Sequence, residues 1–163
     1  MKRQRRFFAT FTVLLLFSFP AFALQAADVN SFKLNTAKGI VPFSSLKGQA
    51  IYLDFWASWC APCRKSFPWL NEMQDRYARD GFRVIAVNLD KDEELARKFL
   101  RENPVNFLIA YDPAGELASD IKVKGMPSSF LIDRNGKIVS SHIGFREKEV
   151  KQMEQKIREL ISK

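Results

Sequence analysis

Cysteine and histidine are scarce in this 163-residue chain, which contains two cysteines and one histidine. A structural zinc site requires four ligands, and beyond the cysteine pair only His142 could add a nitrogen or sulfur donor. The seven glycines form no glycine-rich dinucleotide fingerprint, so the sequence predicts no nicotinamide or flavin cofactor. No internal repeat or low-complexity tract is present, and the length suits one domain with its own core.

Acidic residues are missing from the first 23 positions, which carry four basic residues near Met1 and then an apolar run from Phe7 to Phe22. The segment ends in Ala21-Phe22-Ala23, an A-x-A pattern. A basic head, an apolar middle and a small-residue exit are typical of a secretory signal peptide. We therefore expect a signal peptide over residues 1–23 and a domain over residues 24–163.

Two other interpretations of this segment remain open. The stretch from Phe7 to Ala23 is barely long enough to span a bilayer, so the segment could stay uncleaved as a membrane anchor. Arg5-Arg6 loosely resembles a twin-arginine signal, although the strongly apolar middle favours the general secretory route. Each interpretation places the domain outside the cytoplasm, in a bacterial periplasm or on the outer face of the cytoplasmic membrane.

Half of the net charge of +8 comes from this segment. Without residues 1–23 the chain has 22 basic and 18 acidic residues, a net charge of +4. No basic stripe with interleaved aromatic residues remains, so the sequence does not predict nucleic-acid binding.

Both cysteines belong to one motif, Trp59-Cys60-Ala61-Pro62-Cys63. It follows an apolar run from Ile51 to Trp56, typical of a buried strand, and precedes apolar residues at helical spacing up to about Asp80. Cys60 is thus expected at or near a helix N-terminus, where free N–H groups and the helix dipole favour the thiolate and lower the pKa. One helical turn brings Cys63 back to Cys60, so Cys60 can attack a foreign disulfide and Cys63 can resolve it.

Two alternatives for this pair stay open. A C-x-x-C pair can form half of a metal site, and two cysteines in an exported protein can form a purely structural disulfide. The near-adjacent spacing and an oxidising compartment favour a redox-active couple, with no bound metal.

The rest of the chain alternates predicted strands and helices. Strands are expected at Phe82 to Leu89, Phe107 to Tyr111, Ser129 to Ile132 and Ile138 to Ile143, and a small hairpin at Phe32 to Phe43. Helices are expected at Asp92 to Glu102, with Leu95, Phe99 and Leu100 on the buried face, at Glu116 to Asp120, and at Glu147 to Ile161. The pattern indicates the α/β class, a mixed β-sheet flanked by helices.

Taken together, these residues resemble the thioredoxin superfamily over most of Phe32 to Lys163. The resemblance rests on the segment Asp54 to Cys63, on Pro68 five residues past Cys63, on Gly125-Met126-Pro127-Ser128, and on Gly144. The N-terminal hairpin and an extra strand and helix at about Glu102 to Lys122 are similar to the TlpA/ResA-like branch. The resemblance implies a thioredoxin fold and an exported thiol–disulfide oxidoreductase, often a reductant in cytochrome c maturation.

The resemblance also implies roles for single residues. Pro127 would form a cis peptide bond facing the dithiol, and the Met126 backbone would pair with an extended client; an ordinary trans turn is the alternative. Trp59 and Pro62 would belong to the client-contacting surface. Two departures from the family pattern weaken the transfer of proton chemistry: Ser66 stands where many members carry glutamate, and Ala86 where thioredoxin carries lysine.

Asp54 is the one charged residue of the apolar strand, where an uncompensated carboxylate is costly. Burial should raise its pKa, so that Asp54 could exchange a proton with Cys63. An exposed aspartate without a role is the alternative.

The sequence therefore predicts a thiol–disulfide oxidoreductase with Cys60 as nucleophile, Cys63 as resolving thiol and Asp54 as proton acceptor. Its partners would be protein clients and a membrane thiol carrier that supplies electrons. A disulfide-forming oxidant and a copper-binding chaperone that uses both thiolates and His142 are the other candidates.

Overall fold

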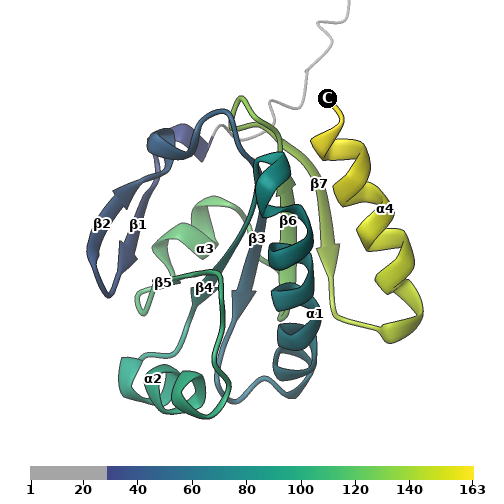
Figure 1. Ribbon diagram of the computed structural model, residues 1–163. Helices are drawn as coiled ribbons and strands as arrows, with labels where there is room; N and C mark the ends of the chain where they lie inside the picture. The colour runs from purple at the N-terminus through teal and green to yellow at the C-terminus, as the bar shows by residue number, and fades with distance from the viewer. Residues whose placement is uncertain (1–28) are drawn as a thin grey trace, which may run out of the picture.

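The computed structural model describes residues 29–163, which form one sheet with helices on both faces (Figure 1). The predicted signal peptide and the predicted domain start at residue 24 lie outside these residues. The strands are β1 (Lys33–Thr36), β2 (Gly39–Pro42), β3 (Ala50–Trp56), β4 (Phe82–Asn88), β5 (Leu108–Tyr111), β6 (Ser128–Ile132) and β7 (Ile138–Ile143). The helices are α1 (Ala61–Tyr77), α2 (Glu93–Glu102), α3 (Glu116–Asp120) and α4 (Val150–Ile161).

The strands of residues 29–163 form a single mixed sheet in the order β2-β1-β5-β4-β3-β6-β7. Strand β3 lies between β4, which is parallel to it, and β6, which is antiparallel. All seven residues of β3 are buried, as expected for an apolar strand covered on both faces. The class and the mixed sheet predicted from the sequence are confirmed.

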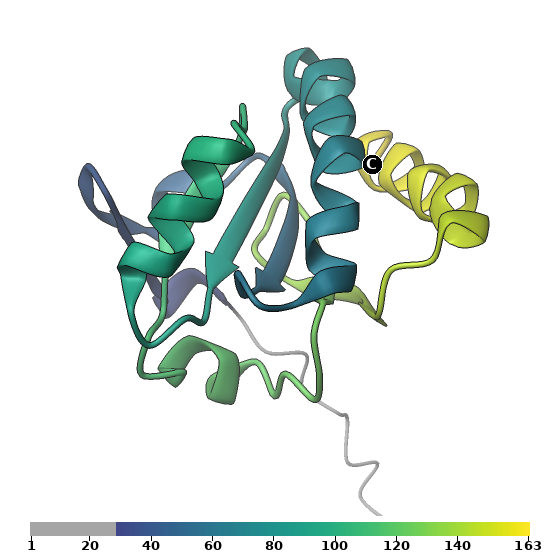
Figure 2. The same cartoon turned by 90° about the horizontal axis from the view of Figure 1, so that it is seen from below.

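Two apolar cores lie on the two faces of this sheet. Helices α1, α2 and α4 cover one face, and α3 covers the other together with two 3₁₀ turns near the N-terminus (Figure 2). The first core contains Trp56, Phe67 and both cysteines. The dithiol is therefore part of a packed core rather than of a mobile loop.

The predicted hairpin and insertion are both present. Strands β1 and β2 pair around Thr36 and Gly39, with Pro42 on the edge strand, where a missing N–H costs no ladder bond. Strand β5 of the insertion pairs parallel to β4, and Asn35 of β1 pairs with Tyr111 on its other side. The hairpin thus extends the sheet beyond β5.

One helix prediction was partly wrong. Leu95 was expected on the buried face of α2, but its side chain is 49% exposed, and Ala96 and Phe99 are the buried residues. Phe99 packs against Trp56 and Phe67, and this contact fixes the rotation of the helix. The last helix, expected from Glu147, begins at Val150 after a 3₁₀ turn at Glu147–Glu149, and it buries Met153, Ile157 and Leu160.

Within residues 29–163, no helix combines the length and apolarity that crossing a bilayer requires.

Candidate active site

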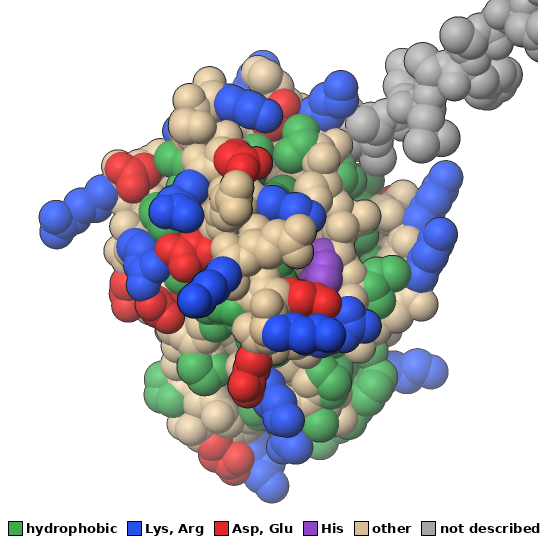
Figure 3. Space-filling model, turned by 90° about the vertical axis from the view of Figure 1, so that its right-hand side faces the viewer, with side chains coloured by type: hydrophobic (Ala, Val, Ile, Leu, Met, Phe, Trp, Pro, Cys, Tyr) green, Lys and Arg blue, Asp and Glu red, His purple; other side chains and the backbone are tan. Residues whose placement is uncertain are grey.

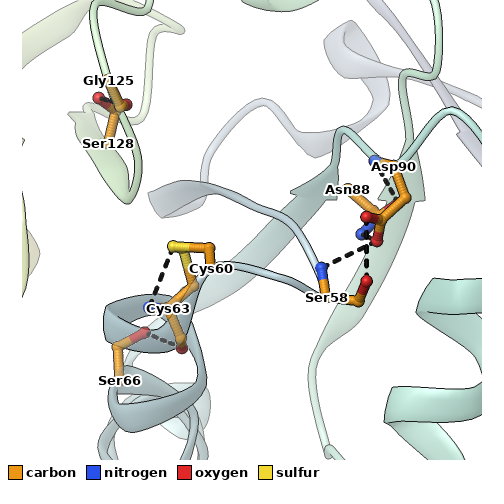
Figure 4. The surroundings of a disulfide bond; sticks show 8 residues. All are labelled: Ser58, Cys60, Cys63, Ser66, Asn88, Asp90, Gly125 and Ser128. Atoms are coloured by element: carbon orange, nitrogen blue, oxygen red, sulfur yellow. Dashed lines mark hydrogen bonds between the residues drawn. A yellow bond between two sulfur atoms is a disulfide. The ribbon is translucent and has the colours of Figure 1, made fainter.

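The dithiol lies where β3 passes into α1 (Figure 4). Cys60 is the N-cap residue of α1, with extended backbone angles, and its Sγ accepts a hydrogen bond of 3.3 Å from the Cys63 N–H. Pro62 lies in the first helical turn, where its missing N–H leaves no bond unmade. The predicted position of Cys60 at the helix N-terminus is confirmed.

The two sulfurs are joined in a disulfide, with 5.3 Å between the Cα atoms. Cys60 keeps 5% of its surface exposed, whereas Cys63 is completely buried. An incoming sulfur can therefore approach Cys60 more readily than Cys63. No acidic residue occupies the first turn of α1, so the helix N-terminus offers its partial positive charge to a Cys60 thiolate unopposed.

Asp54 is buried in the middle of β3, with 2% of its surface exposed. By strand alternation its side chain lies on the same face as Tyr52 and Trp56, the face on which both cysteines pack. Burial raises the pKa of its carboxyl well above the ordinary value, and Oδ2 has no hydrogen-bond partner within residues 29–163. The structure excludes the alternative of an exposed aspartate.

The loop before β6 supplies the opposite side of the site. The Met126–Pro127 peptide bond is cis, as predicted, and Met126 packs against the core that contains both cysteines. The Ser128 hydroxyl donates to the Gly125 carbonyl at 2.6 Å, and the Gly144 N–H donates to the Pro127 carbonyl at 2.8 Å. Figure 4 shows Gly125 and Ser128 on a separate loop, apart from the end of α1 that carries the sulfurs.

Apolar side chains lie on the surface around the disulfide. Trp59 is 67% exposed, Pro62 is exposed and Met126 is half-buried. Ile143, which pairs with Ser128 at the end of β7, is 52% exposed and was not predicted to belong to the site. The sequence alone could not indicate this position, because Ile143 comes beside the cis-proline loop through the pairing of β6 with β7.

Figure 4 also shows a buried polar cluster of Ser58, Asn88 and Asp90, which the sequence did not predict. The Asp90 carboxylate accepts the Ser58 N–H at 2.9 Å, the Ser58 hydroxyl at 3.0 Å and the Asn88 side-chain amide at 2.8 Å. Asn88 and Asp90 lie at the carboxyl end of β4, which is parallel and adjacent to β3. The carboxyl ends of neighbouring parallel strands meet at one edge of a sheet. The order of the predicted strands could therefore have indicated that Asn88 and Asp90 lie near the loop after β3. The cluster holds the loop that leads into Cys60.

Replacing Asp90 with alanine should destabilise the protein. Three buried or half-buried donors would lose their common acceptor, and we expect a loss of about 3 kcal/mol in the free energy of unfolding. Urea unfolding measures this loss. The matched control is Asp92→Ala, which removes the exposed N-cap of α2 and should cost about 1 kcal/mol. Equal losses in the two variants would show that the cluster does not hold the loop.

Comparison with known proteins places this geometry in a family. The Redoxin family model matches residues 18–157. The chain belongs to the Redoxin family.

Named relatives match most of the chain. The chain is 31% identical to the thiol-disulfide oxidoreductase ResA of Bacillus cereus over 162 residues, which cover 91% of this chain and 94% of the relative. It is 34% identical to the sporulation thiol-disulfide oxidoreductase A of Bacillus subtilis, covering 74% of each chain. A crystal structure of a thiol:disulfide interchange protein DsbE from Chlorobium tepidum is 47% identical, with a TM-score of 0.81 over 84% of this chain and 97% of that one. This Redoxin-family chain is a thiol–disulfide oxidoreductase of the TlpA/ResA-like branch of the thioredoxin superfamily.

The structure locates both departures from the family pattern. Ser66 is buried in α1 and donates its hydroxyl to the Cys63 carbonyl at 2.8 Å, so it binds the helix backbone and carries no titrating group. Ala86 pairs directly with Asp54 across β3 and β4. On the β4 side, this Redoxin-family member therefore offers the carboxyl no side chain that could accept a proton.

His142 lies on β7, with Nε2 3.3 Å from Glu149 Oε2. Among residues 29–163, no group of three or more histidine, cysteine, aspartate or glutamate side chains could hold a metal ion. Trp56 and Trp69 are core residues; Trp69 packs on Tyr52.

Proposed function

We propose that this thiol–disulfide oxidoreductase works outside the cytoplasm as a reductant of protein disulfides. The observation that carries the proposal is Cys60 at the N-cap of α1, the more exposed sulfur of the pair. A thiolate at this position is stabilised and accessible, as an attacking sulfur must be. The composition of residues 1–23 supports export, and the direction of electron flow is the one that the resemblance to the TlpA/ResA-like branch implies.

The reaction transfers two electrons to the client. The Cys60 thiolate attacks the client disulfide, forms a mixed disulfide and releases one client thiolate, which takes up a proton. Cys63 passes its proton to the Asp54 carboxylate, and its thiolate then attacks Cys60 Sγ. The second client thiolate leaves, and the chain is left with the Cys60–Cys63 disulfide. A membrane-bound dithiol carrier returns two electrons and two protons and becomes a disulfide itself.

Client binding follows from the surface around the sulfurs. Trp59, Pro62 and Met126 present apolar area on which an extended client segment can lie. We propose that the Met126 backbone pairs with this segment as an added strand while Pro127 keeps the approach to Cys60 open. Proteins of cytochrome c maturation, whose cysteines must be reduced before haem attachment, are the proposed client class.

Equilibrium redox titration of the Cys60–Cys63 pair tests the direction. A reductant should have a potential near that of thioredoxin, about −270 mV, and the protein should reduce insulin with dithiothreitol as electron source. A potential near that of the strong oxidant DsbA, about −120 mV, would contradict the proposal and favour disulfide formation. Absence of insulin reduction together with tight copper binding by the reduced protein would favour a chaperone.

A further inference from the structure

A row of polar side chains crosses the sheet beneath the dithiol. Asp54 of β3 pairs directly with Ser129 of β6, and Ser129 pairs with His142 of β7. Directly opposed residues on antiparallel strands point to the same face with Cβ atoms about 4.5–5.5 Å apart. Asp54, Ser129 and His142 therefore form one continuous row on the face that α1 and α4 cover.

The row begins at a carboxyl that must gain and lose a proton in every catalytic cycle. Asp54 is buried, and on its β4 side the neighbouring residue is Ala86. Tyr52 and Trp56 precede and follow Asp54 on the same face of β3. Ser129 is the cross-strand neighbour of Asp54 with a hydroxyl that can both accept and donate a proton.

A small cavity continues the row towards α4. It has a volume of about 20 Å³ and is lined by Tyr52, Ser129, Ser140, His142 and Lys156, among others. A cavity needs about 10–15 Å³ to hold one water molecule, provided polar groups surround it. The cavity, which Ser129 and His142 both line, thus has room for one water molecule.

The row ends at the surface. The His142 side chain is 27% exposed, and Figure 3 shows the imidazole, in purple, at the surface among acidic and basic side chains. The charged groups near it are Glu149, whose Oε2 lies 3.3 Å from Nε2, Arg146, which donates to Glu149 at 2.8 Å, and Lys156 of α4. An imidazole can accept a proton on one nitrogen and release one from the other, which is what the end of a proton route requires.

We propose that Ser129 and His142 carry protons between Asp54 and solvent through this cavity. The inference rests on the proposed function, in which Asp54 receives the Cys63 proton. The Asp54 carboxyl then gives a proton to the Ser129 hydroxyl, which passes its own proton through the cavity to His142. His142 releases a proton to bulk water and returns to its neutral form. When the membrane carrier reduces the Cys60–Cys63 disulfide, protons move in the opposite direction, from solvent through His142 and Ser129 to Asp54.

The test is the rate at which Cys63 resolves the mixed disulfide. The reduced protein is mixed with excess insulin in weak buffer, quenched with acid at intervals, and the decay of the mixed disulfide is followed by mass spectrometry from pH 6 to 9. His142→Ala should slow resolution about tenfold at neutral pH, less than the roughly 10²–10⁴-fold effect of removing a general acid or base itself, because His142 acts only through Ser129 and Asp54. Added imidazole should restore the rate in proportion to its concentration, which a purely structural role of His142 would not produce.

Three further variants separate the alternatives. Ser129→Ala should be as slow as His142→Ala, whereas Ser129→Thr, which keeps the hydroxyl, should remain within about twofold of the wild type. Val139→Ala is the control, because Val139 lies on β7 three residues before His142, is 51% exposed and does not line the cavity, and it should not change the rate. If Ser129→Ala does not fold, the imidazole series with His142→Ala decides alone.

A resolution rate in His142→Ala that stays within twofold of the wild type and does not respond to imidazole would overturn the proton route. A different result would contradict the proposed function. The wild-type protein itself would then form no mixed disulfide with insulin, or would form one that Cys63 never resolves.

Discussion

A Cys63→Ala variant should halt at the mixed disulfide. Cys60 remains at the N-cap of α1 and can still attack a client disulfide, but no second sulfur is present to release the client. Catalytic turnover should fall by on the order of 10³-fold or more, because no other group can perform the resolving step of Cys63. The expected product is a covalent complex that migrates at the combined mass on a non-reducing gel and separates on addition of dithiothreitol.

The matched control is Cys60→Ala. Its remaining sulfur, Cys63, is completely buried in the structure and should capture no client. If Cys60→Ala captured clients and Cys63→Ala did not, the two cysteines would have roles opposite to the proposed ones. The Cys63→Ala complex also identifies clients, because the captured protein can be sequenced.

An Asp54→Asn variant should be more stable than the wild type at high pH and slower in catalysis. Burial raises the pKa of Asp54, so the folded protein holds this proton more tightly than the unfolded chain does. The wild type is therefore most stable below the unfolded pKa of about 3.9, and it loses stability as the pH rises towards the folded pKa. Asparagine has no charge to bury, so this loss should disappear.

Urea unfolding of the two oxidised proteins at pH 4, 6 and 8 measures the effect. We expect the wild type and Asp54→Asn to have similar free energies of unfolding at pH 4. At pH 8 Asp54→Asn should be more stable by about 2 kcal/mol or more, which is the cost of an unsatisfied buried polar group. Resolution by Cys63 should slow by about 10²-fold, because the proton acceptor is gone. A stability difference that does not change with pH would show that Asp54 does not titrate within this range.

The sequence was sufficient to predict those parts of the site that depend on neighbours in the chain. The position of Cys60 follows from an apolar strand that ends just before a helical pattern, and the burial of Asp54 follows from the apolar residues on either side of it. Resemblance to a family was needed for the cis bond at Pro127, because no local pattern distinguishes it from a trans turn.

The sequence did not indicate contacts that depend on strand pairing. Nothing in the chain places Asp90 beside Ser58, 32 residues earlier, until β3 and β4 are known to be parallel neighbours. Ser129 and His142 come opposite each other only through the register of β6 and β7, which includes an irregularity near Ile132. The rotation of α2 was misjudged at Leu95 for the same reason, because Phe99 finds its partners on β3 and α1.

The hairpin of β1 and β2 has a consequence for handling the protein. It occupies the side of β5 that would otherwise be an open edge, and Leu34, Phe43 and Val29 fill the core beneath it. An uncovered strand edge beside exposed apolar surface is a template for aggregation. A shortened chain should therefore begin before Val29, because cutting into the hairpin would uncover the edge of β5 and favour aggregation.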